Sequence, residues 1–236
     1  MPLFSPLDVI ALAWFLGAWA TYSIALSLTE KRRKGLNSEM NRYRDVWMFE
    51  MLAREIRMVD AQIVAALQNG TAFFASTSLI AIGGALTLVR STEEIIQVVA
   101  MLPFGVQMTR VQWEAKSVGL AIIFVYAFFK FGWAYRLYNY VAILVGSTPP
   151  AREKDTPRAR AHAERVGQLC EVAGRHFNRG QRAFFFALGY LGWFISPWLL
   201  MVTSVAVAVV LWRRQFASDS RRALITPGTA EPQSPN

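Results

Sequence analysis

The sequence predicts an all-α integral membrane protein: a bundle of four transmembrane helices with an amphipathic helix at the membrane interface after the first. Of its 236 residues, 54% are hydrophobic and only 17% are charged, whereas soluble domains average about 45–50% and about 25%. The charges also stand in blocks between long uncharged stretches, and those stretches approach the roughly 20 residues that a helix needs to cross a bilayer. This composition excludes an ordinary soluble domain and a disordered chain.

The expected spans follow from the apolar stretches and the charges that bound them. In the first, Asp8 is the only charge and a basic block follows at 31–34, which is the reverse of a signal peptide. Lys130 and Arg136 interrupt the third. Pro197 removes a backbone donor in the fourth, and we expect it to kink or tilt that helix. The four spans are predicted at residues 7–28, 71–89, 117–145 and 183–212.

The distribution of Lys and Arg predicts the orientation, because cytoplasmic loops collect these residues. Residues 29–70 and 146–182 hold eight each, 90–116 hold three, and the tail after Trp212 holds four. Four crossings with the N-terminus outside put sixteen inside and seven outside. We therefore expect a multi-pass protein of the bacterial inner membrane with both termini outside and both long basic loops in the cytoplasm. The net charge of +9 then reports topology, and no nucleic-acid partner is expected.

The segments between the spans carry weaker patterns. Residues 38–68 form an amphipathic helical segment with two apolar stripes about 140° apart at ~100° per residue. Either two helical pieces with a break near Met51–Ala53 or one helix covered on several sides satisfies both stripes. The 90–116 segment predicts a short interfacial helix, and 147–182 a basic helical loop. Residues 1–216 then form the membrane domain and 217–236 a disordered tail.

The usual catalytic and cofactor patterns do not occur in the sequence. A haem held between helices needs facing histidines, but His162 and His176 both lie in the basic loop. One cysteine, Cys170, and no acid cluster leave no expected metal site or cofactor. No serine has a plausible histidine partner, and there is no Gly-x-Ser-x-Gly or P-loop motif. We therefore expect no enzymatic activity.

Several short patches, in order along the chain, resemble the domain-of-unknown-function 599 family of integral membrane proteins. The resemblance reaches to about Pro197, and it implies four membrane helices and no established activity. The patches are Arg44-x-x-Trp47-Met48 with Arg54, Arg57 and Asp60; Phe73-Phe74-Ala75-Ser76-Thr77 ahead of Gly83-Gly84; Lys130-Phe131-x-Trp133-x-x-Arg136-x-Tyr138-Asn139-Tyr140; and Asn178-Arg179-Gly180-x-Arg182-Ala183 with Trp193-Phe194-x-x-Pro197.

Three charges stand where an apolar environment is expected. Lys130 lies deep in the third span, where an ammonium group is costly and needs a partner, while Arg136 is nearer the cytoplasmic end and can extend its charge to the interface. Asp60 lies on the apolar side of the amphipathic segment, and a carboxylate there needs a cation. Its partner is either Arg57, one turn away, or Lys130 or Arg136 of the third span.

Asn139, Ser76 and Thr77 complete the candidate polar site, although hydroxyl groups in membrane helices usually bond to a carbonyl one turn back. Two functions remain open. The first is a non-catalytic membrane component, such as a scaffold, assembly factor or accessory subunit. The second is a small oligomeric transporter or channel built around Lys130, Arg136 and Asp60. Expected partners are the lipid bilayer, with anionic headgroups at the basic loops, and other membrane proteins or further copies of the chain.

Overall fold

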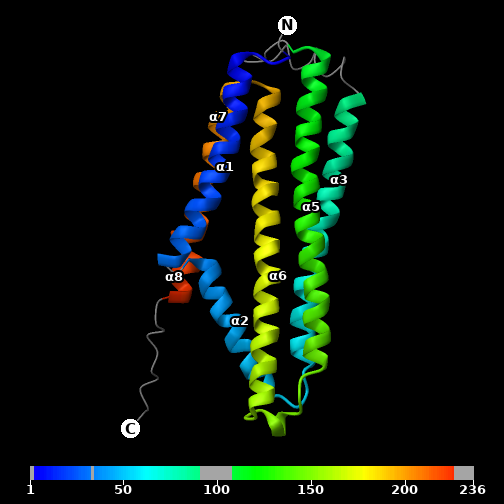
Figure 1. Cartoon of the computed structure of the whole chain (residues 1–236), viewed down its shortest axis with the longest axis vertical. Helices are drawn as coiled ribbons and strands as arrows, with labels where there is room; N and C mark the ends of the chain where they lie inside the picture. Colours follow the sequence, from blue (N-terminus) through cyan, green and yellow to red (C-terminus); the bar gives the residue numbers. More distant parts are fainter. Residues whose placement is uncertain (1–2, 33–34, 91–107, 226–236) are drawn as a thin grey trace, which may run out of the picture.

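A computed structural model describes residues 3–32, 35–90 and 108–225 of the chain, and within these ranges all regular elements are helical (Figure 1). The α-helices are α1 (Pro6–Arg32), α2 (Leu36–Leu52), α3 (Met58–Arg90), α5 (Arg110–Gly146), α6 (Pro157–Tyr190), α7 (Pro197–Phe216) and α8 (Asp219–Ile225), and the short 3-10 helices are η1 (Ala151–Glu153) and η2 (Leu191–Phe194).

The predicted all-α membrane fold is confirmed. Four stretches of the described helices are long and apolar enough to span a bilayer: Pro6–Glu30, Met58–Arg90, Arg110–Gly146 and Pro197–Leu224. The chain is therefore a multi-pass membrane protein. Three of the four contain the expected first, second and third spans, and α3 continues well beyond its expected span at the end of the molecule where α2 lies (Figure 1).

The fourth span differs from the prediction, because 183–212 is not one helix. α6 ends at Tyr190, η2 turns the chain, and α7 begins at Pro197. Ser196 caps α7, its hydroxyl accepting from the Leu199 backbone N–H at 3.1 Å, and proline is favoured at the first helical position because its missing N–H has no partner there anyway. Pro197 therefore starts a new helix and does not kink an existing one.

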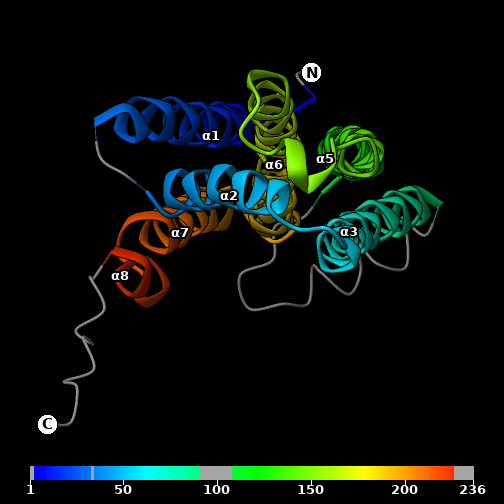
Figure 2. The same cartoon turned by 90° about the horizontal axis from the view of Figure 1, so that it is seen from below.

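α6 is the central helix of the bundle. α5 and then α3 lie on one side of it, and α7 and then α1 lie on the other, with α2 along its lower half (Figures 1 and 2). Its upper half packs among aromatic rings, since Phe186 is fully buried, stacks on Trp19 at 5.3 Å and meets Phe15 edge-on at 5.9 Å. The interior at this level is filled with rings.

The chain reverses at η2, so the two ends of the described chain lie at opposite ends of the bundle. Trp193 of η2 is hydrogen-bonded to Asp8 near the start of α1, and Gln215 near the end of α7 is hydrogen-bonded to Glu30 near the end of α1. α1 and α7 therefore run in the same direction. This differs from the expected arrangement, in which an even number of crossings returns both termini to one side.

The remaining segments resolve the open alternatives. The break expected near Met51–Ala53 is present, since α2 ends at Leu52 and α3 begins at Met58, so 38–68 is two helical pieces of which the second continues into the membrane span. The basic loop 147–182 is mostly helical, because residues 157–182 form the first three quarters of α6. Part of the tail expected to be disordered is helical, as α8. The interfacial helix expected after Arg90 falls mainly on residues outside the described ranges.

Candidate functional site

Asp60 is fully buried at the start of α3, in a cluster with Trp47 and Arg54 that we call the Asp60 cluster. The indole Nε1 of Trp47 donates to Asp60 Oδ1 at 2.7 Å, and the guanidinium of Arg54 forms an ion pair with the same oxygen. Neither partner weighed from the sequence is correct. Arg54 precedes Asp60 by six residues, and the non-helical turn between α2 and α3 brings the two together.

Arg57 fixes the same turn to α5. Its guanidinium donates to the carbonyl oxygens of Met51 and Thr148, each at 3.3 Å, and of Pro149 at 2.7 Å. These carbonyls lie at the ends of α2 and α5, where backbone acceptors lack helical partners. The turn is therefore held to α3 by Arg54 and to the end of α5 by Arg57.

The anchored turn presents apolar side chains to the outside, a surface we call the α2–α3 tip. Ile56 is 77% exposed, Met58 66% and Val59 60%. Val59 is 31 positions from Arg90 along the chain, or roughly 46 Å at ~1.5 Å per residue. If the hydrocarbon layer of ~30 Å begins at Arg90, the tip lies roughly 15 Å beyond its other face. Contiguous exposed apolar surface outside the bilayer is typical of a contact site for another protein.

The other predicted site residues do not converge on Asp60. Lys130 is half-buried and lies 5.1 Å from the ring centroid of Tyr126. Arg136 is exposed on the outer face of α5, where its Nε donates to the Tyr140 hydroxyl at 2.7 Å. Asn139 accepts a hydrogen bond from the Gln68 side chain at 2.6 Å, which ties α5 to α3.

The hydroxyl residues of the second span also lie apart. The Thr77 hydroxyl donates to the Phe73 carbonyl one turn back at 2.8 Å, as expected for membrane helices, and Ser76 is exposed. The six predicted residues are thus spread over α3 and α5. They do not form one polar site.

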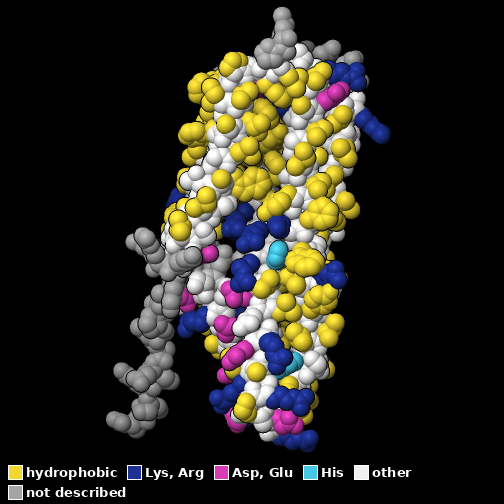
Figure 3. Space-filling view, in the orientation of Figure 1, with side chains coloured by type: hydrophobic (Ala, Val, Ile, Leu, Met, Phe, Trp, Pro, Cys, Tyr) yellow, Lys and Arg dark blue, Asp and Glu magenta, His cyan; other side chains and the backbone are white. Residues whose placement is uncertain are grey.

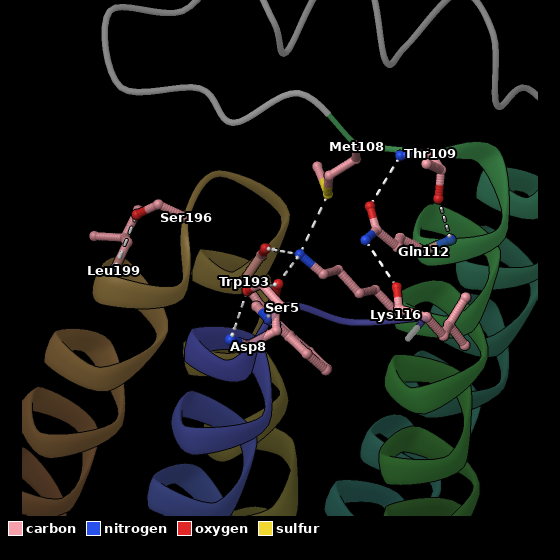
Figure 4. Close-up of polar contacts among 10 residues, drawn as sticks. Ser5, Asp8, Met108, Thr109, Gln112, Lys116, Trp193, Ser196 and Leu199 are labelled. Atoms are coloured by element: carbon pink, nitrogen blue, oxygen red, sulfur yellow. Dashed lines mark hydrogen bonds and ion pairs between the residues drawn. The ribbon is translucent and has the colours of Figure 1, made fainter. Parts of the chain in front are cut away.

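A second buried ionic group lies at the other end of the bundle, where Ser5, Asp8, Lys116 and Trp193 form what we call the Asp8 cluster (Figure 4). Lys116 Nζ is 3.4 Å from Asp8 Oδ1 and donates to the Trp193 carbonyl at 2.9 Å. Trp193 Nε1 and the Ser5 hydroxyl donate to the Asp8 carboxylate at 2.8 and 2.6 Å. Lys116 and Asp8 are 3% and 9% exposed.

The Asp8 cluster joins the starts of α1 and α5 to η2 at the top of α6. The sequence does not predict this cluster, because Asp8 lies at the far end of its span from Lys130 and Lys116 falls just outside the expected third span. The available signal was that each is a single charge at the same expected end of an apolar span. The cluster is internally paired, and we assign it a structural role.

A family model described as "Protein of unknown function, DUF599" matches residues 10–220 of the chain. No curated protein and no solved structure matches it.

Proposed function

Since the chain belongs to the DUF599 family of proteins of unknown function, we propose that it is a non-catalytic membrane component: a scaffold, assembly factor or accessory subunit that binds another protein through its α2–α3 tip. The observation that carries this proposal is the tip itself. Ile56, Met58 and Val59 are exposed on a turn that Arg54 and Arg57 fix in place, and α3 is long enough to carry this turn out of the hydrocarbon layer. A pre-ordered apolar surface loses little conformational entropy on binding.

The packing of the bundle favours a non-catalytic membrane component over a transporter or channel. The rings of Trp19, Phe186 and Phe15 fill the space beside α6, and the buried charges Asp8 and Lys116 are satisfied by each other and by Trp193. A polar pathway needs charged or hydroxyl groups facing one another along the membrane normal.

We also propose that the protein lies in a bacterial inner membrane with its N-terminus outside and its basic segments in the cytoplasm. The support is the excess of Lys and Arg in residues 29–70 and 146–182. In this fold Arg213, Arg214, Arg221 and Arg222 join that same side, because α7 ends beside Glu30. The tail arginines then agree with the other basic segments, whereas an even number of crossings would separate them.

Site-specific photo-crosslinking in cells tests the binding function. A photoreactive residue at Val59 is expected to capture one partner reproducibly, and Ile56→Ser combined with Val59→Ser is expected to abolish its co-purification. Gln62→Ser, an exposed polar position one turn into α3, is the matched control and should leave the partner bound. Equal recovery of the same proteins with the double variant and with the control would contradict the proposal.

A further inference from the structure

A cleft of about 580 Å³ opens between α1, α2 and α6, on the side of the bundle where α1 ends. Arg175, Arg179 and Arg182 line its α6 wall, at a spacing that places them on one helix face. Figure 3 shows a dark blue group of basic side chains at the lower end of a hollow whose upper part is lined by yellow hydrophobic ones. We call this site the arginine cleft. Its opposite wall is polar and includes Ser23, Ser27, Glu30, Asn37 and Asn41.

Arg182 enters the membrane layer. It lies 11 positions before Trp193 of the Asp8 cluster, or roughly 16 Å at ~1.5 Å per residue, whereas Glu30 lies 22 positions from Asp8, or roughly 33 Å by the same rise. The next residue, Ala183, is fully buried in the apolar core. A guanidinium that starts from this depth is costly unless its charge is compensated, and such residues usually mark a functional site.

Two of these arginines have no direct side-chain partner among the described residues, although the Glu30 carboxylate acts on Arg182 through space. Arg175 is paired with Glu171 at 2.6 Å, and Glu171 also accepts from Asn41 at 3.0 Å. By contrast, Arg179 and Arg182 form no hydrogen bond or ion pair with any residue in the described ranges.

Glu30 is the acidic neighbour of Arg182, and its carboxylate is already engaged by another donor. It accepts from Gln215 Nε2 at 3.0 Å, and Asn37 lines the cleft beside it. The cleft therefore holds two guanidinium groups with free donors facing one opening.

We propose that the arginine cleft binds the phosphate group of a membrane phospholipid, with Arg179 and Arg182 as its donors. The planar guanidinium matches phosphate oxygens in a bidentate manner. The cleft extends from the depth of Arg182 to Glu30 at the end of α1, so its lower part opens at the headgroup level of that leaflet. The hollow above it, lined by hydrophobic side chains, gives the acyl chains an apolar path (Figure 3). The polar wall of Ser27 and Asn37 supplies further hydrogen bonds to the headgroup.

This inference goes beyond the proposed function and is independent of it, because the cleft and the α2–α3 tip share no residue. A variant of the cleft can lose lipid binding and still bind the protein partner, and a variant of the tip can lose the partner and still bind the lipid.

The test measures lipid retention by native mass spectrometry of the full-length protein in mild detergent, titrated with dioctanoyl phosphatidylglycerol. The wild-type chain is expected to bind one molecule, and Arg179→Gln combined with Arg182→Gln to weaken binding about tenfold or more, since two charge-assisted contacts are lost. Arg158→Gln is the matched control, because Arg158 is an exposed arginine at the start of the same helix. It should bind as the wild type does.

Two further ligands separate the lipid from its parts. Dioctanoylglycerol, which has the same chains without the phosphate, should not bind, and millimolar inorganic phosphate should not displace the phospholipid. Displacement by inorganic phosphate would overturn the lipid as the source of the phosphate, and equal binding by the double variant would overturn the site. Arg179→Gln alone alters only an exposed side chain, so it should weaken binding without unfolding the protein and keeps the test decisive.

Discussion

The indole nitrogen of Trp193 donates a 2.8 Å hydrogen bond to the carboxylate of Asp8, joining residues 185 positions apart in the sequence. The same carboxylate oxygen is the acidic partner of Lys116. One oxygen therefore connects α1, α5 and η2, the turn that reverses the chain. Much of the packing at this end of the bundle depends on it.

Removing either charge of the Asp8 cluster should destabilise the protein. Asp8→Asn or Lys116→Met alone leaves the other charge buried, which costs about 3 kcal/mol. The double variant should lose much less than the sum of the two, because no unpaired charge remains. Thermal unfolding in detergent measures this. The control is Glu114→Gln, which removes the exposed pair with Arg110 and should change stability by less than about 0.5 kcal/mol. Strict additivity of the two buried changes would contradict the coupling.

The partner of Asp60 is testable by a second cycle. Asp60→Asn should cost about 2 kcal/mol, somewhat below the usual cost of a buried pair because Arg54 is 41% exposed and can regain water. Its effect should be non-additive with Arg54→Gln. The losses of unfolding free energy caused by Asp60→Asn and Lys130→Gln should be additive within about 0.5 kcal/mol, since these two residues share no contact among the described side chains. Urea or thermal unfolding measures both double-mutant cycles. Non-additive effects of Asp60→Asn and Lys130→Gln, with additive effects of Asp60→Asn and Arg54→Gln, would contradict the observed pairing.

The turn at η2 predicts an odd number of crossings. Reporter fusions after residue 216 should report the same side as insertions at residues 152–155, and the side opposite to an N-terminal fusion. The physical reason is that α7 ends beside Glu30 and begins beside Trp193. A C-terminal reporter on the N-terminal side would restore the even arrangement expected from hydropathy alone.

Close helix packing at Gly192 should be sensitive to one methyl group. A Cβ there would lie 2.9 Å from the Thr203 hydroxyl and 3.1 Å from the backbone of Leu199, so Gly192→Ala should cost about 1–3 kcal/mol through overpacking. Gly70→Ala is the control, because a Cβ at Gly70 meets no atom within 4 Å. In mid-helix it should stabilise by about 0.5–1 kcal/mol. Thermal unfolding compares the two.

Asp45 predicts a dependence of stability on pH. Burial and the neighbouring Glu171 raise the pKa of the Asp45 carboxyl above its ordinary value near 3.8, with Arg44 opposing. The folded state therefore holds this proton more tightly than the unfolded state, and Asp45 loses stabilisation as the pH rises from about 4 through its raised pKa. Asp45→Asn should gain stability relative to the wild type over that interval and keep the gain at neutral pH. A constant difference from pH 4 to 7 would contradict the shift.

The helical class and the first three spans were predictable because each is a long apolar run bounded by charges, the strongest signal that hydropathy gives. The break between α2 and α3 was also predictable, since the two stripes of residues 38–68 point in different directions. The reversal at η2 was not predicted, because Leu191–Phe194 is as apolar as its surroundings. The local signal was Ser196 followed by Pro197, a helix start that was interpreted as a kink.

The candidate site was less predictable than the fold. Helical spacing was used to choose partners for Asp60, but Arg54 reaches it across a non-helical turn, where such spacing does not apply. The sequence does not predict the arginine cleft, because Arg175, Arg179 and Arg182 lie in the segment expected to be a basic loop, 147–182. In the folded protein α6 continues into the membrane layer, and these three arginines line a cleft between α6, α1 and α2.

The position of α6 has a consequence for how the protein is made. It lies at the centre of the bundle, yet it is not among the helices apolar enough to enter a bilayer alone, and it carries arginines through its middle. We therefore expect α6 to enter the membrane together with α7, to which η2 joins it by a short turn, as a helical hairpin. Biogenesis should then be a two-stage process, in which α1, α3 and α5 insert independently and the last pair completes the bundle by docking between them.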